Sequence, residues 1–580
     1  MKWRYLYSLE GLGGLWISLA ILIIETLIIV LKSPLRTMTP QSLSVPTPQT
    51  LALFMYLVSV FAIPALFAWR TNISKELANI QRRYAPKALI PVRISELKKK
   101  IGLILISIPL SVLFTLVGLI YGVSYLCLLS LIPVAILTSI ILRPYLAIYK
   151  HRMELDHELC WFLVLLIIAE SVGAGWKYLS RRLIESRILP ATARELEVID
   201  RDARIYFPSH IDAMLHRSSL TPNERFGRLL AGYASRLREG SNVLSWLYSW
   251  LREEFVRLEF NYRLFAERIA SLIGQMGLAI YAILPLISIS MASITGLNIV
   301  TYVVILATPL LTMIAYVLRP RTLDRVSLTP SIISFTLLIF IAILLYKLVG
   351  PLSLVLGWCL ALIPSLQLYA RVKECEALQV ESLEFLREII ELKRCGYSIA
   401  AAFQYIAKMP TYSSSLRKYL TKIVQLIELG IPLTHIATLI KTPSFVLRYT
   451  LFSLGLIHEC GGGSIEAIQH LYESLKHMHM LIGNAKRVSL FFDIFAIINT
   501  IIVAIISRLI IRLSSVGLTL AYSFPLMTLP EVSSTTISLV LLISALGYSV
   551  VSTTVRRGIP LIEPRQGIFL GIAAVMSTLV

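Results

Sequence analysis

The sequence predicts an all-α polytopic membrane protein with about ten transmembrane helices and two cytoplasmic helical-bundle domains in a tandem duplication. Three observations predict this fold class. The 580-residue chain is 56% hydrophobic and 15% charged, whereas a soluble protein carries about 25% charged residues. Several apolar runs reach the roughly 20 residues that cross a bilayer. One spacing of glycine, threonine and proline residues occurs twice.

The repeated spacing relates two stretches of the chain by one fixed interval. In each copy a glycine, a Thr-Pro pair and a second glycine follow one another at identical separations. The residues of the first copy are Gly175, Thr221, Pro222 and Gly240, and those of the second are Gly396, Thr442, Pro443 and Gly461. We call the interval from Gly175 to Gly396 the repeat offset. A match at a fixed offset is typical of a duplicated structural unit.

The apolar runs and the polar stretches between them predict the order of the domains. This order is an N-terminal transmembrane hairpin (1–69), a basic cytoplasmic loop (70–100), a transmembrane pair (101–142), a first cytoplasmic helical domain (143–270), a transmembrane pair (271–318), a further transmembrane pair (331–370), a second cytoplasmic helical domain (371–488), a transmembrane pair with an external loop from Arg512 to Ser533 (489–555), and a C-terminal tail with a short apolar segment (556–580).

Basic residues set the orientation. The net charge is +21, and in a membrane protein such an excess indicates basic cytoplasmic loops rather than nucleic-acid binding. The loop 70–100 alone carries nine Lys and Arg residues. Counting spans from an inside N-terminus places this loop, both large polar domains, the linker 319–330 and Arg556-Arg557 on the cytoplasmic face. We therefore expect a multi-pass protein of the cell membrane with its N-terminus and both domains cytoplasmic.

The pattern of the polar domains predicts helical bundles. Apolar residues recur at helical spacing, as in Leu229, Leu230, Tyr233 and Leu237, and strand patterns are nearly absent. Thr221 and Pro222 predict a helix start, with threonine as the N-cap and proline at the first helical position. Gly240 predicts the end of that helix and Ser241 the cap of the next. The apolar stretch 161–169 is too short to span and predicts a buried helix.

Signs of catalysis are weak. The six cysteines lie far apart with no CxxC pair, so we expect neither a zinc site nor a disulfide framework. The phosphate-binding pattern GxxxxGK[ST] is absent, and Gly461-Gly462-Gly463-Ser464 is interpreted as a helix–helix turn. His470, Glu473 and His477 could share a helix face and hold a metal, but solvated or capping histidines are the favoured interpretation. We expect no enzyme activity, no catalytic residue, no cofactor and no metal.

Two segments of the second copy resemble the type II secretion F domain. They are Gly396-Tyr397-Ser398-Ile399-Ala400-Ala401-Ala402 and Gly463-Ser464-Ile465-Glu466-Ala467-Ile468, each a glycine turn followed by a short amphipathic helix start. The first copy matches less cleanly, because Pro208-Ser209 stands where the second has Gly430-Ile431-Pro432. The resemblance covers residues 101–555. Two tandem domains with extra spans are similar to the platform proteins of archaeal type IV pili and archaella.

This resemblance implies a function and partners. It implies a non-catalytic membrane scaffold that docks a hexameric secretion ATPase and passes pilin or archaellin subunits from the lipid bilayer into a filament. It also implies a homodimer, and no nucleic-acid partner is expected. Residues of the basic helix faces are the predicted ATPase contacts: Arg181, Arg182, Arg236, Arg238, Lys393, Arg394, Arg417 and Lys418. The alternative is a transporter or channel with a pathway between two parallel repeats.

Overall fold

The computed structural model describes the backbone of residues 87, 89, 131–269, 271, 274–283, 297–319, 323–324, 327–409, 412–461, 464–521 and 534–579. The chain divides into two compact units, one of residues 1–83 and 91–143 and the other of 84–90 and 144–580. Almost all described residues belong to the second unit. The predicted N-terminal hairpin, the basic loop apart from residues 87 and 89, and most of the pair at 101–142 lie outside the described residues.

Every regular element in the described ranges is helical, as the sequence predicts. In chain order the helices are α6 (Leu131–Ser171), α7 (Gly175–Ser186), α8 (Pro190–Ile205), α9 (His210–Leu220), α10 (Glu224–Glu239), α11 (Val243–Arg268), α12 (Gly274–Leu278), the π-helix η3 (Ala279–Ile283), α15 (Leu297–Leu318), α16 (Thr329–Val349), the 3₁₀ turn η4 (Gly350–Leu352), α17 (Ser353–Arg394), α18 (Ile399–Ala407), α19 (Ser414–Glu428), α20 (Leu433–Leu439), α21 (Phe445–Glu459), α22 (Ile465–Ala521), α23 (Ser534–Arg557) and α24 (Gln566–Leu579).

The helix bounds recur at the repeat offset found in the sequence. Helix α7 ends at Ser186 and α18 at Ala407, and α10 begins at Glu224 and α21 at Phe445, so both pairs of bounds are separated by the offset that relates Gly175 to Gly396. We call the polar part of α6 with α7 to α11 the first block. The polar part of α17 with α18 to α21 and the start of α22 is the second block. One hydrophobic cluster of buried residues runs through both blocks.

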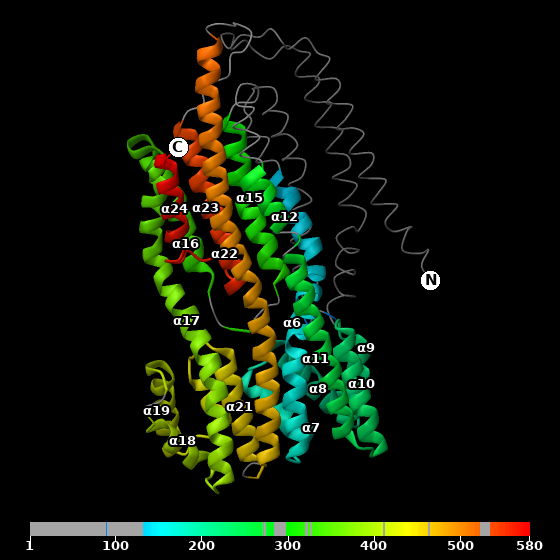
Figure 1. Cartoon of the computed structure of the whole chain (residues 1–580). Coiled ribbons are helices and arrows are strands. Elements are labelled where there is room, and N and C mark those ends of the chain that lie inside the picture. Colours follow the sequence, from blue (N-terminus) through cyan, green and yellow to red (C-terminus); the bar gives the residue numbers. More distant parts are fainter. Residues whose placement is uncertain are drawn as a thin grey trace, which may run out of the picture. The chain divides into compact units, whose positions relative to one another are not determined.

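Three helices run without a break from apolar sequence into a block. Helix α17 has 42 residues and α22 has 57, and α6 begins before the predicted boundary at 142. The predicted domain boundaries at 142, 370 and 488 therefore fall inside helices. Figure 1 shows α22 as one continuous helix beside α23, and these two helices are in contact. Helix α22 continues to Ala521, so the first residues of the predicted external loop 512–533 are helical.

Two stretches of the described residues are long and apolar enough to cross a membrane. One lies in Thr329–Arg394, where the apolar window has a mean hydropathy of 2.6 and is 11% buried, and the other is Ser538–Arg557, with a mean hydropathy of 1.8 and 83% buried. Shorter apolar helices cover Ala307–Leu318, Asp493–Ile506 and Gln566–Ser577. The ten spans expected from the sequence remain a prediction.

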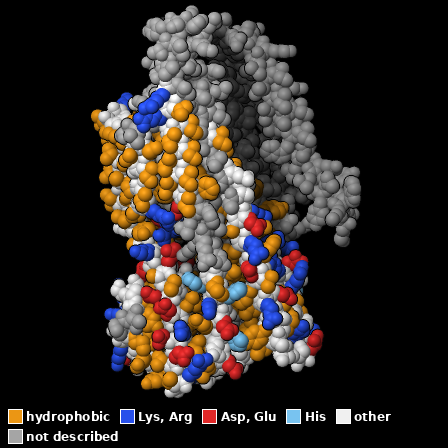
Figure 2. Space-filling view, in the orientation of Figure 1, with side chains coloured by type: hydrophobic (Ala, Val, Ile, Leu, Met, Phe, Trp, Pro, Cys, Tyr) orange, Lys and Arg blue, Asp and Glu red, His pale blue; other side chains and the backbone are white. Residues whose placement is uncertain are grey.

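The surface divides by residue type. Large hydrophobic side chains are exposed along α16 and the first part of α17, including Phe340 at 65%, Ile343 at 71% and Leu348 at 80%. Figure 2 shows hydrophobic side chains over this part and interleaved charged side chains over the blocks. Exposed apolar area on this scale marks a surface that water does not normally cover. The short apolar helix α24 packs on α22 and α23.

Candidate functional site at the junction of the apolar helices and the second block

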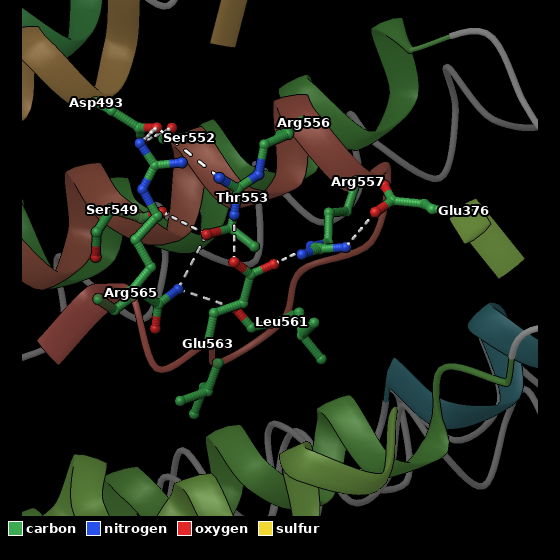
Figure 3. A network of polar contacts seen from close by, with 12 residues as sticks. Glu376, Asp493, Ser549, Ser552, Thr553, Arg556, Arg557, Leu561, Glu563 and Arg565 are labelled. Carbon is green, nitrogen blue, oxygen red and sulfur yellow. Dashed lines mark hydrogen bonds and ion pairs between the residues drawn. The ribbon is translucent and has the colours of Figure 1, made fainter. Parts of the chain in front are cut away.

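Charged side chains from four segments meet where the apolar helices reach the second block (Figure 3). Asp493 of α22 is 6% exposed and forms an ion pair of 2.8 Å with Arg565. Its other carboxylate oxygen accepts a hydrogen bond of 2.5 Å from the Ser552 hydroxyl of α23. Arg556 approaches the same carboxylate at 4.0 Å. Because a buried unpaired carboxylate is costly, these partners explain how Asp493 is held within an apolar helix.

A second carboxylate lies on the strap, which we define as residues 558–565 between α23 and α24. Glu563 is 1% exposed, and one of its oxygens pairs with Arg556 and the other with Arg557. Arg557 also pairs with Glu376 of α17 at 2.9 Å and lies over the Tyr369 ring, 5.0 Å from its centroid. Charge-assisted bonds, which are the stronger class of hydrogen bond, therefore join the strap to α23 through Glu563 and α23 to α17 through Arg557.

Backbone groups of the strap are also satisfied by the helices around it. The Ile562 carbonyl accepts a hydrogen bond of 2.7 Å from Ser365 of α17, and the Pro560 carbonyl accepts one from Ser331 of α16. Leu561 is fully buried against Leu368 and Val372. Irregular backbone among apolar helices needs such internal partners, so the strap is an integral part of the helix packing.

Positive and negative side chains are equal in number at the junction. Arg556, Arg557 and Arg565 face Asp493, Glu563 and Glu376, three cations against three carboxylates. The sequence singles out Asp493 and Arg556-Arg557 as charges beside apolar runs. It gives no sign of Glu563 or of the strap, because the contacts of the strap with α16 and α17 arise from tertiary packing. The arrangement is suited to join helices firmly.

The two blocks meet at a second polar centre. Glu459 at the end of α21 accepts hydrogen bonds from the Tyr178 hydroxyl at 2.6 Å and the Thr434 hydroxyl at 2.6 Å, and pairs with Arg182 at 2.9 Å. Partial burial and the Glu459 carboxylate raise the pKa of Tyr178 to about 12. The phenol therefore remains a proton donor at neutral pH, and the contact joins the first block to the second.

An aromatic contact reinforces this interface. The Trp161 ring of α6 packs edge-on against Phe445 at 4.9 Å and Tyr449 at 4.8 Å, both on α21. The Tyr449 hydroxyl donates a hydrogen bond of 2.8 Å to the Trp161 carbonyl. The apolar stretch 161–169 is buried apart from a half-buried Trp161, so its apolar character serves packing within and between the blocks.

The predicted ATPase contacts differ in exposure and in their partners within the chain. In the first block Arg181 pairs with Glu185, Arg182 with Glu459 and Arg238 with Asp212, and Arg236 stacks over Trp246 at 4.9 Å. In the second block Arg394 pairs with Glu391, Arg417 donates to the Tyr412 carbonyl, Lys393 is half-buried, and Lys418 is exposed. Arg182 is only 22% exposed, so its guanidinium serves the interface between the blocks.

The predicted helix starts need a correction. Thr221 closes α9 as its C-cap, and the N-cap of α10 is Asn223, whose side-chain oxygen accepts from the amides of Arg225 and Phe226. At the repeat offset Ser444, rather than Thr442 or Pro443, caps α21. The sequence favours threonine because proline suits the first helical position, but here Pro222 and Pro443 precede the cap.

The glycine turns adopt the backbone that glycine favours. Gly240 is the C-cap of α10 with φ +65°, and Gly175, Gly396 and Gly461 also have positive φ. A side chain is strained in this region. Asn242, rather than Ser241, is the N-cap of α11. The four glycines therefore lie at helix junctions, away from the charged junction.

Two histidines of the second block, His470 and His477, line a groove of about 570 Å³ between α6, α11 and α22. The His470 ring contacts Tyr248 at 4.9 Å and the His477 ring contacts Phe255 at 4.6 Å. Val164, Ile167 and Ile168 form the apolar floor. These contacts place the histidines in the packing between the two blocks.

No family model, no curated protein and no solved structure matches this chain.

Proposed function

We propose that this protein is the non-catalytic membrane platform of a machine that assembles type IV filaments. In this proposal a cytoplasmic hexameric secretion ATPase docks on the two blocks, and the apolar helices pass pilin or archaellin subunits from the membrane into the growing filament. The single observation that carries the proposal is the continuity of α6, α17 and α22 between the apolar helices and the blocks.

A continuous helix transmits displacement along its length. At 1.5 Å per residue, α22 with its 57 residues extends about 85 Å. A block that is pushed or turned at one end of such a helix must move the apolar segment at the other end, unless the helix kinks. Helix α17 contains Pro364 and α6 contains Pro144 in its interior, whereas α22 contains no proline. The geometry therefore supports a mechanical role.

Exposed apolar side chains, together with the basic residues beside them, support a membrane position for the apolar helices. The window in Thr329–Arg394 is 11% buried within the chain, so its side chains need a nonpolar environment such as lipid. The junction lies at the boundary that the basic residues predict to be cytoplasmic. Exposed Tyr149 and Lys150 on α6 follow the predicted pair at 101–142, in keeping with the aromatic and basic residues of membrane interfaces.

The transporter alternative receives less support. A transport pathway normally uses several ionisable groups near the membrane midplane. Asp493 is already paired with Arg565 at the junction. Asn499 of α22 donates to the Tyr281 carbonyl at 3.2 Å, and the Tyr281 hydroxyl donates to Thr308 at 2.9 Å. These groups satisfy one another between apolar helices and carry no charge.

The test is removal of the protein from its own cells. We expect a deletion strain to lose surface filaments, counted by electron microscopy, and to regain them with the wild-type chain. Uptake of small solutes should be unchanged. Filaments that persist without the protein, or a loss of solute uptake with filaments intact, would refute the platform and favour the transporter.

A further inference from the structure

Helix α19 of the second block has a basic face whose two lysines form no ion pair with the described residues. Lys418 and Lys422 are exposed one turn apart, and neither forms an ion pair or hydrogen bond with a residue that the structure describes. Leu429 follows α19 and is 75% exposed. The apolar residues of α19 face the other way, since Leu416, Leu420 and Ile423 are buried.

The first block supplies an internal comparison. At the repeat offset Lys418 corresponds to Glu197 and Lys422 to Arg201. There Arg201 pairs with Asp202 at 2.8 Å, and the neighbouring Arg204 pairs with Asp200 at 2.6 Å. On this surface the arginines of the first block are paired with carboxylates, whereas the two lysines of the second block have no such pair among the described residues. Two like charges at i and i+4 repel each other, so helix stability does not account for the lysine pair.

We infer that the α19 face, formed by Lys418, Lys422 and Leu429, is the docking surface for an acidic protein partner. This inference rests on the proposed function, in which that partner is the secretion ATPase. It places the contact on the second block, whereas the first-block arginines predicted from sequence have partners within the chain. Charge complementarity steers such encounters, and one exposed leucine adds an apolar anchor.

An anionic membrane is the competing partner for exposed lysines. Membrane attachment by charge alone uses clusters of about four to eight basic residues. Arg417, Lys418 and Lys422 are the three basic residues of α19. An amphipathic membrane helix would also present its apolar side to lipid, but the apolar side of α19 is buried in the block. The observations therefore favour a protein partner.

The experiment measures the Kd of the full chain for the purified hexameric secretion ATPase of the same organism. The chain is held in nanodiscs of phosphatidylcholine alone or of phosphatidylcholine with phosphatidylglycerol. We expect K418E/K422E to weaken binding about tenfold or more in both lipids, and L429A to weaken it several-fold. The matched control is R201E/R204E at the corresponding surface of the first block, which should change Kd less than about twofold. Native-like unfolding temperatures would confirm that each variant is folded.

The outcomes separate the inference from the proposed function. If the wild-type chain binds the ATPase and K418E/K422E binds equally well, the α19 face is wrong and the platform stands. If K418E/K422E weakens binding only in the anionic nanodiscs, the lysines act on lipid and the inference is overturned. If the wild-type chain does not bind the ATPase in either lipid, the proposed function itself fails.

Discussion

The buried ionic triad of the first block offers a sharp test of the physical reasoning. Glu195 of α8 lies 2.7 Å from the His151 ring of α6 and receives hydrogen bonds of 2.6 and 3.0 Å from Arg217 of α9. All three side chains are at most 2% exposed. At the repeat offset His151 and Glu195 correspond to Val372 and Leu416, which are both buried. The second block thus forms the same helices with apolar residues at these two positions.

The expected magnitudes follow from the cost of an uncompensated charge. Glu195→Leu removes the carboxylate that His151 and Arg217 bind, and removing one member of a buried ion pair should cost about 3–5 kcal/mol of the free energy of unfolding. The triple variant H151V/E195L/R217M removes every charge of the triad. Replacing a buried ion pair by apolar residues of similar volume is neutral or stabilises by about 1–4 kcal/mol. The triple variant should therefore be more stable than the single one.

Hydrogen exchange read by mass spectrometry over residues 145–220 measures the local opening of the first block. The single variant should exchange roughly 10²- to 10⁴-fold faster than the wild type, and the triple variant should exchange at the wild-type rate or more slowly. The exposed substitution Glu267→Gln serves as the control. If the triple variant exchanges as fast as the single variant, the ionic triad contributes packing that apolar residues cannot replace, and the argument from unpaired charge is refuted.

Further predictions concern pH, the strap, the helix caps and the interface. Burial raises the pKa of Glu195, but hydrogen bonds from His151 and Arg217 outweigh burial and hold the pKa below its usual value of 4.5. The stability that the Glu195 carboxylate contributes should therefore persist at neutral pH and be lost as pH falls below about 4.5. In an acid titration of stability, E195L should remove this pH dependence. Glu563→Gln should cost about 3–5 kcal/mol and speed proteolysis of the strap, whereas Glu267→Gln should not. Asn223→Ala should cost about 1 kcal/mol and Thr221→Ala less, by exchange of the first α10 amides; equal effects would contradict the cap assignment. A double-mutant cycle of Tyr178→Phe and Glu459→Gln should give a coupling of about 0.5–3 kcal/mol, and additive effects would exclude the contact.

The sequence predicts the helical elements well where hydropathy and turns coincide. Helix α15 ends at Leu318, where the predicted pair 271–318 ends, and α16 begins at Thr329, close to the start of the predicted pair 331–370. The sequence does not predict the continuity of α17 and α22, because a change in hydropathy marks a change in surroundings rather than a break in the backbone. The predicted N-caps are misplaced, since Thr-Pro is also compatible with the residues before a helix.

The sequence predicts only part of the charged junction. Asp493 and Arg556-Arg557 stand out beside apolar runs, but Glu563 gains its role from Arg556, Arg557 and the burial that tertiary packing provides. The triad could have been found by aligning the two copies, because His151 and Glu195 stand where Val372 and Leu416 occur. Periodicity alone misses such positions, since a buried polar group and an apolar one occupy the same helix face.

The contact of Trp161 with α21 has a consequence for how many blocks can stack. The first block contributes α6 and the second block contributes α21, so the contact joins two different faces, as in a head-to-tail arrangement. The positions of Phe445 and Tyr449 on α21 are taken in α10 by Glu224 and Arg228, which are exposed and paired at 2.6 Å. A charged face cannot receive another tryptophan without stripping water from both ions. Like the polar capping repeats of repeat proteins, α10 presents a charged face that does not pack against a further block.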